Sequence, residues 1–211
     1  MIAERPDTIA VSPDLALEAA LALPAGASAG VVVCHPHPLY GGDMDSPVVL
    51  AIAQACAEAG LATLRFNFRG VGGSGGAWDE GRSEQDDVRA ALAHLQACLP
   101  ATARPALAGY SFGAMMAAAV AGAGRPLAGL ALIAPPLAMR PWQPPAVLAV
   151  EGPLLLLAGD ADQYCPASAL TALGQALPKP TVTILDGVDH FFFGGLDRLT
   201  SAVGAWAATI S

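Results

Sequence analysis

Short apolar runs alternate along most of the chain with longer segments in which apolar residues recur at helical spacing. The apolar runs predict strands at 29–35, 61–68, 105–110, 127–135, 152–159 and 181–187. The segments between and after them predict helices at 46–60, 83–98, 111–124, 166–177 and 196–209. Strands that are apolar on both faces and alternate with helices indicate an α/β fold, with a mostly parallel central sheet and helices on both faces.

Residue types at the segment ends support these boundaries. Ser46 is placed as a helix N-cap, Pro47 suits the first helical turn and Gly60 suits a helix end. Ahead of the first parallel strand, residues 8–23 predict one or two antiparallel edge strands. No repeat or linker interrupts the chain, so we expect a single domain over residues 1–211.

Composition and charge narrow the classes of partner. The 10 Lys and Arg residues against 18 Asp and Glu residues give a formal net charge of −8 without a basic cluster, so we expect no nucleic-acid partner. Although 54% of the residues are hydrophobic, Gly and Pro interrupt the apolar runs well short of the ~20 residues that cross a membrane. We therefore expect a soluble protein with no membrane partner.

The start of the chain and the cysteines bear on its location. The first residues, MIAERPDTIAVSPD, carry acidic residues and prolines where a signal peptide has a basic start and an apolar core, which favours a cytoplasmic location. The 4 cysteines form no CxxC pair and are expected to be free thiols. Both a monomer and a homodimer stay open.

A serine between two glycines follows the strand predicted at 105–110. The run GYSFG places Ser111 two residues after Gly109 and two before Gly113, which is the spacing of a nucleophile elbow. Such a tight turn from strand to helix leaves no room for Cβ atoms at the flanking positions. Taken alone, the run fits an ordinary serine N-cap better, so the assignment depends on a base and an acid within reach of Ser111.

The ends of later strands supply candidates for both groups. Ligands of an open parallel sheet bind at the carboxyl ends of its strands. Asp162 and His190 each follow a predicted strand, which gives the chain order Ser, Asp, His. His190 would accept the Ser111 proton, and Asp162 would orient its ring and stabilise the imidazolium. Two other carboxylates are weaker candidates for the acid: Asp160, which suits a turn, and Asp189, which adjoins His190 in the chain.

The loop CHPHPLYGGDMDS, which follows the strand at 29–35, is a candidate for stabilising an oxyanion. One backbone N–H donor is expected from Phe112, the residue after the nucleophile, and a second from this loop. The two prolines have no N–H, which leaves His37 or Leu39 as the second donor. Tyr40 could add a hydroxyl group.

Two other functions that the sequence suggests, metal binding and dinucleotide binding, are not supported by the residues around the motifs. His35 and His37 could share a metal ion, but no third ligand stands at a recognisable spacing, so we expect no metal site. The glycines of GVGGSGG spell a dinucleotide-binding motif, yet the next helix opens only near Ser83, too far away to hold a pyrophosphate. We therefore expect no cofactor.

Taken together, these motifs resemble the α/β-hydrolases, and within them the small bacterial serine hydrolases with an HPHPLYGG loop. The resemblance spans nearly the whole chain and rests on residues 35–42, 64–76, 109–114, 159–166 and 189–194. It implies the triad Ser111, Asp162 and His190 and activity toward esters of small acyl groups. The interval 135–152 is too short for a cap domain, which favours short or flexible acyl chains. Residues expected in the substrate pocket are Tyr40, Trp142 and Phe191.

The expected function is that of a carboxylesterase that cleaves a small-molecule ester through an acyl-enzyme. A thioesterase or a dienelactone-type lactonase would use the same groups. A protein of this fold that binds a ligand without turnover is the alternative from another class, because a fold does not imply an activity.

Overall fold

The computed structural model describes residues 3–122, 126–139 and 148–210. Its strands are β1 (Arg5–Ser12), β2 (Leu15–Ala22), β3 (Gly30–Cys34), β4 (Ala62–Phe66), β5 (Pro105–Tyr110), β6 (Leu130–Ile133), β7 (Leu154–Gly159) and β8 (Thr181–Leu185). Its helices are the short 3₁₀ helix η1 (Pro38–Tyr40) and α1 (Pro47–Glu58), α2 (Glu84–Ala97), α3 (Phe112–Ala121), α4 (Ala167–Ala176) and α5 (Leu196–Ala207).

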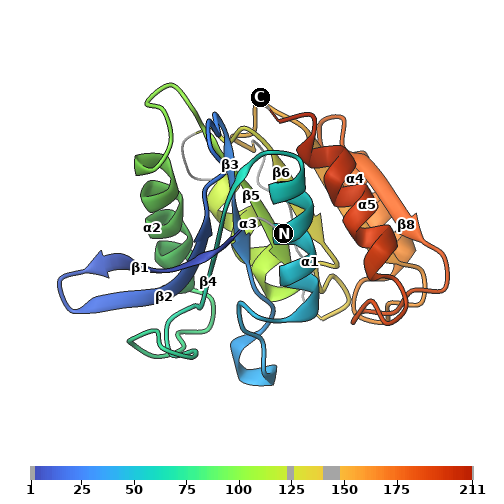
Figure 1. Ribbon diagram of the computed structural model, residues 1–211. Coiled ribbons are helices and arrows are strands. Elements are labelled where there is room, and N and C mark those ends of the chain that lie inside the picture. The colour runs from blue at the N-terminus through green and yellow to red at the C-terminus, as the bar shows by residue number, and fades with distance from the viewer. Residues whose placement is uncertain (1–2, 123–125, 140–147, 211) are drawn as a thin grey trace.

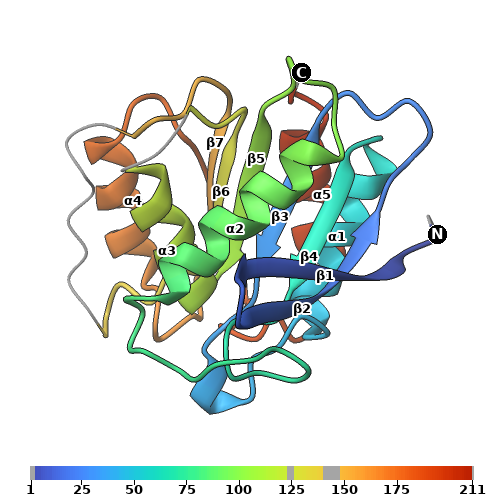
Figure 2. The ribbon, with the colours of Figure 1, turned by 90° about the vertical axis from the view of Figure 1, so that its left-hand side faces the viewer.

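The eight strands of the described residues belong to one sheet with the order β1-β2-β4-β3-β5-β6-β7-β8. The pairs β1–β2 and β2–β4 are antiparallel, and every other neighbouring pair is parallel. Helices α1 and α5 lie side by side on one face of the sheet, while α2, α3 and α4 cover the other (Figures 1 and 2). The predicted α/β fold is confirmed, and the edge strands expected within 8–23 are the antiparallel pair β1 and β2, of which β1 begins earlier, at Arg5.

Burial follows the position of each strand in the sheet. Every residue of β3, β4, β5, β6 and β7 is buried, because helices cover both faces there. The edge strands β1 and β8 are partly exposed. Among the described helices, none is both long enough and apolar enough to cross a membrane.

Most of the predicted strands are shorter in the structure, and the largest differences are at β4 and β6, whose ends bind elsewhere. β4 ends at Phe66, and the N–H of the following Phe68 donates to the ring of His35. β6 begins at Leu130, since Leu127 makes only an isolated bridge to Val150. These changes leave the strand order untouched.

The parallel strands direct their carboxyl ends to one edge of the sheet, which is the lower edge in Figure 1. The loop with η1 after β3 and the glycine-rich loop after β4 both leave the sheet there (Figure 1). Ser111, Asp162 and His190 follow β5, β7 and β8. Strand order therefore brings together residues that are far apart in the sequence.

Candidate active site

Three side chains from three strand ends form one chain of hydrogen bonds. The Nε2 atom of His190 lies 3.0 Å from Ser111 Oγ, and its Nδ1 atom lies 2.7 Å from Asp162 Oδ2. A carboxylate can only accept, so Nδ1 carries the ring proton and Nε2 is left to accept from the serine hydroxyl. All three residues are buried, which strengthens these interactions relative to water.

Ser111 stands in a strained turn between β5 and α3. Its φ of 55° and ψ of −116° lie in a region that residues with a side chain rarely adopt. A Cβ atom on Gly109 would lie 2.2 Å from the carbonyl oxygen of Gly113, and one on Gly113 would lie 2.3 Å from that of Cys34. The two flanking glycines are therefore required by the close approach of the backbone, as a nucleophile elbow demands.

Asp162 is fixed by the loop that carries it. Its Oδ1 atom accepts the backbone N–H groups of Tyr164 and Cys165 at 2.8 and 2.9 Å, which leaves Oδ2 for His190. The other two carboxylates that the sequence offered as the acid have other hydrogen-bond partners. Asp160 accepts the N–H of Gly187, and Asp189 accepts the N–H of Phe193. Neither makes a hydrogen bond to the His190 ring within the described chain.

Two backbone N–H groups beside Ser111 have no partner among the described residues: those of Phe112 and His37. Phe112 begins α3, so its N–H belongs to the free N-terminal end of a helix. The N–H of Leu39, the other candidate, donates to His37 Nδ1 at 3.2 Å and is not free. The geometry therefore favours His37 over Leu39 as the second donor to an oxyanion.

An aromatic cluster holds these two donors together. The ring of Trp78, from the loop after β4, lies 4.7 Å from the His37 ring and 5.0 Å from the Phe112 ring, and the latter two are 5.2 Å apart. The loop is anchored by the fully buried Glu84, whose carboxylate accepts the N–H groups of Asp79 and Gly81. Trp78 thus bridges the two elements that supply the donors.

His35 is a structural histidine. Its Nδ1 donates to the carbonyl of Pro36 at 2.6 Å, and its Nε2 accepts the N–H of Phe68 at 3.0 Å. Burial lowers the pKa of His35 to about 4, so the ring is neutral at neutral pH. Both of its ring nitrogens are occupied by these hydrogen bonds.

The pKa of the neighbouring His37 ring is also lowered by burial. No group of three possible metal ligands occurs among the residues that the structure describes.

Comparisons with known proteins identify the family of the chain. A family model described as serine aminopeptidase, S33, matches residues 27–151, which is more than half of the chain. The chain belongs to this family of α/β serine hydrolases. An uncharacterised protein of Rickettsia prowazekii is 32% identical over 186 residues, which cover 85% of this chain and 78% of that protein.

Solved structures resemble this hydrolase over nearly its whole length. An α/β serine hydrolase homologue from Coxiella burnetii is 34% identical with a TM-score of 0.85, over 95% of this chain and 96% of that one. A lidless α/β serine hydrolase from Xanthomonas campestris is 35% identical with a TM-score of 0.82, over 96% and 92% of the two chains. In this hydrolase, no helix or strand that could form a cap lies between β6 and β7 among the residues that the structure describes.

Two of the three residues expected in the substrate pocket, Tyr40 and Phe191, are exposed next to site residues. Tyr40 is strongly exposed, and its ring packs on His37 at 4.7 Å. Phe191 is also exposed, and its ring stands nearly perpendicular to that of His190 at 5.6 Å. Trp142 lies outside the described residues.

Sequence reasoning missed two residues that support the site. Trp78 stands in a glycine-rich loop whose pattern does not predict where the side chain packs. The buried hydroxyl of Tyr110 donates to the carbonyl of His190 at 2.8 Å, across 80 positions of sequence. Only its place inside the GYSFG run could have drawn attention to it.

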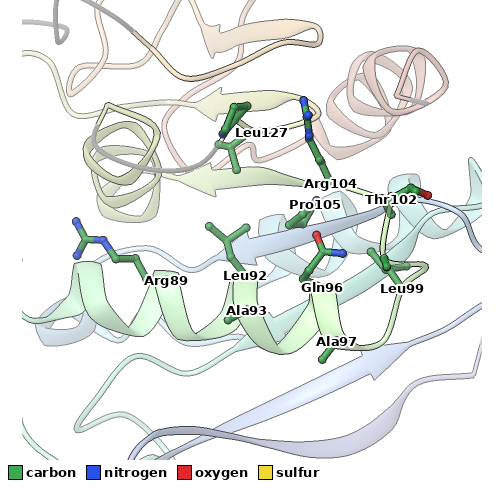
Figure 3. Close-up of a pocket in the computed structure, with 13 residues that line it drawn as sticks. Arg89, Leu92, Ala93, Gln96, Ala97, Leu99, Thr102, Arg104, Pro105 and Leu127 are labelled. Carbon is green, nitrogen blue, oxygen red and sulfur yellow. The ribbon is translucent and has the colours of Figure 1, made fainter.

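A surface groove lies at the other edge of the sheet and is separate from the triad. Leu92 and Gln96 of α2 face Arg104, Pro105 and Leu127 across it (Figure 3). The described residues that line it include no histidine, cysteine or carboxylate. The groove therefore offers no group able to act as a general base.

Proposed function

We propose that this protein is a carboxylesterase that cleaves small, uncharged esters through an acyl-enzyme on Ser111. The observation that carries the proposal is the continuous hydrogen-bond chain from Ser111 through His190 to Asp162. The N–H groups of Phe112 and His37, which have no partner among the described residues, complete the site. A nucleophile, a base, an orienting acid and an oxyanion site are the parts that acyl transfer requires.

The proposed reaction proceeds in two halves. Ser111 Oγ attacks the ester carbonyl carbon while its proton passes to His190 Nε2, and the oxyanion is bound by the N–H groups of Phe112 and His37. His190 then gives that proton to the leaving alkoxide as the carbon–oxygen bond breaks, which releases the alcohol and leaves the acyl-enzyme. Water attacks the acyl-enzyme in the same way and releases the acid. Asp162 stabilises the imidazolium in both halves.

The two carboxylates that support the reacting groups directly have no oxygen left for a charged substrate. An aminopeptidase substrate carries an ammonium group, which needs a carboxylate or other acceptor near the scissile bond. Glu84 and Asp162 accept hydrogen bonds on both oxygens, whereas Asp160 and Asp189 each accept a backbone N–H on Oδ1 alone. We propose ester rather than peptide cleavage because the carboxylates beside the base and under the donor loop are fully occupied.

The test is the hydrolysis of nitrophenyl esters from acetate to laurate by the wild type and by Ser111→Ala. We expect turnover of the short esters by the wild type and a loss of about 10⁴-fold or more in Ser111→Ala. Thioesters and lactones assayed in parallel would assign the leaving group. Absence of turnover of every substrate by a folded wild type would favour a binding protein of hydrolase fold instead.

A further inference from the structure

The large apolar side chains that are most exposed gather at the edge of the sheet that holds the triad. Among the described residues, those more than half exposed are Leu39, Tyr40, Met139, Phe191 and Phe193. All five stand in loops that follow the parallel strands β3, β6 and β8. Exposed apolar side chains collected at one place mark a surface that binds something apolar.

One of these residues, Phe191, stands beside the proposed base, and Phe193 packs against it. Phe191 and Phe193 are 54% and 77% exposed, and their rings are 6.0 Å apart. The Phe191 ring also lies 5.6 Å from the His190 ring. The residue between them is fully buried, so the run of three phenylalanines turns its outer two rings toward solvent and its middle ring into the core.

The backbone is strained to achieve this arrangement. Phe192 has a φ of 58°, a left-handed conformation that costs a bulky residue on the order of 1 kcal/mol or more. Its ring packs edge-on against Tyr110 at 6.0 Å, and Asp189 accepts the N–H of Phe193 at 3.1 Å. These contacts hold the turn in place, so the two outer rings have a defined position rather than being left on a loose loop.

The proposed chemistry says which part of a substrate meets these rings. His190 must protonate the leaving oxygen, so that oxygen lies within about 3 Å of Nε2 when the carbon–oxygen bond breaks. The alcohol part of the ester therefore lies beside the His190 ring, and Phe191 is an exposed apolar ring within 5.6 Å of it. The oxyanion donors belong to the separate cluster of His37, Trp78 and Phe112, which makes no ring contact with Phe191 or Phe193 among the described residues.

We infer that Phe191 and Phe193 form a binding surface for the alcohol part of the substrate, which is an apolar and preferably aromatic group. The inference rests on the proposed function and makes it more specific. The substrate class is an ester of a short acid with an aromatic or other bulky apolar alcohol. The two exposed rings stack on that group while the ester bond reaches Ser111.

The test compares acetate esters that differ only in the alcohol: ethyl, benzyl and naphthylmethyl acetate. We expect Phe191→Ser and Phe193→Ser each to lower kcat/KM for the two aromatic esters by about tenfold and to change ethyl acetate by less than twofold. Phe193→Trp, which keeps an aromatic ring at this position, should retain the wild-type preference for the aromatic esters over ethyl acetate. Both side chains are exposed, so these variants are expected to fold.

A second measurement separates binding of the alcohol from damage to the catalytic groups. All three esters give the same acetyl-enzyme, from which the alcohol has already left. The rate constant of its hydrolysis, measured after a burst with nitrophenyl acetate, should be the same in the variants as in the wild type.

The matched control is Tyr40→Ser, which removes an equally exposed ring that packs on His37. It should leave the ratio of kcat/KM between benzyl and ethyl acetate unchanged, even where both values fall. Equal losses on ethyl and benzyl acetate, a slower deacylation, or the same effect in Tyr40→Ser would overturn the inference while leaving the esterase proposal intact. A wild type that hydrolyses no ester would remove both.

Discussion

The two edges of the same sheet differ in how the chain is packed. At the carboxyl edge, a Cβ atom on Gly109 or Gly113 would overlap a backbone carbonyl, and Ser111 and Phe192 have positive φ values. At the amino edge, Gly60 has a positive φ in open space, although the backbone also approaches closely at Gly152, where a Cβ atom would lie 1.7 Å from the Ala128 carbonyl oxygen. What distinguishes the carboxyl edge is that its turns carry buried polar groups, Ser111, Asp162 and His190, which a site for chemistry requires in fixed positions.

The charged groups show the same difference. At the carboxyl edge, the buried carboxylate of Asp162 accepts three hydrogen bonds, one of them from the His190 ring. Near the amino edge, Arg104 and Glu151 form an ion pair in which both side chains are more than half exposed. An exposed pair contributes little to stability, while a buried carboxylate orients whatever it binds. Matched substitutions at the two edges should therefore have very different consequences.

The largest effect is expected for Asp162→Asn. The amide cannot accept both the two backbone N–H groups and the His190 Nδ1–H, so the ring loses the tautomer that leaves Nε2 free to accept. We expect kcat for nitrophenyl acetate to fall about 10⁴-fold, measured by steady-state kinetics. Asp160→Asn is the control, since its amide oxygen can still accept from Gly187, and kcat should change less than threefold. A reversed order would identify Asp160 as the acid.

The variants Gly113→Ala at the carboxyl edge and Gly60→Ala at the amino edge compare how much an added methyl group lowers the free energy of unfolding. The new methyl group at position 113 would lie 2.3 Å from the Cys34 carbonyl oxygen, whereas at position 60 it meets nothing within 4 Å. We expect the free energy of unfolding in urea to fall by about 3 kcal/mol or more for Gly113→Ala. Gly60→Ala should cost about 1 kcal/mol, because only the left-handed φ opposes it. Equal costs would show that the elbow is not tightly packed.

His35 should make stability fall in acid. Its pKa is lowered to about 4 in the folded chain and is about 6.5 in the unfolded chain, so the unfolded state binds the proton more readily between these values. This stabilisation is complete above pH 6.5 and is lost as the pH falls toward 4. Between pH 7 and pH 5 we expect His35 to account for about 2 kcal/mol of the loss in unfolding free energy.

The measurement is urea unfolding of the wild type and His35→Gln at both pH values. Glutamine can accept the Phe68 N–H but does not titrate, so the variant should be less stable at pH 7 and should lose less stability on acidification. An identical loss in the two proteins would mean that His35 is not buried in neutral form.

A smaller effect is expected for Trp78→Leu. Loss of the ring that bridges His37 and Phe112 should loosen the spacing of the two N–H donors, which lowers kcat about tenfold with little change in KM. Trp206→Leu is the control. Trp206 packs in the core and donates to the Pro153 carbonyl, so its loss should lower the melting temperature and leave kcat unchanged. A rise in KM alone would instead make Trp78 a wall of the substrate pocket.

Residues that directly follow a strand could be placed from the sequence. Ser111, Asp162 and His190 each come at the end of an apolar run, and parallel strands end at one edge, so their meeting follows from the order of elements. Their roles stay a proposal, but their proximity was predictable.

Contacts that depend on long-range packing could not be predicted. The choice between His37 and Leu39 depends on the position of the His37 ring, which packs against Trp78 and Phe112 and accepts the N–H of Leu39. The partner of Asp160 is Gly187, from the loop after another strand. The same holds for Trp78, since a loop of glycines has no periodicity that would fix where its one large ring packs.

The central claim is that Ser111 is the nucleophile, and the most direct measurement is labelling with a fluorophosphonate followed by mass spectrometry of the peptides. The account predicts one equivalent of label, attached to Ser111, with no label on Ser111→Ala and slower labelling of Asp162→Asn. A folded wild type that stays unlabelled, or a label attached to another residue, would contradict it.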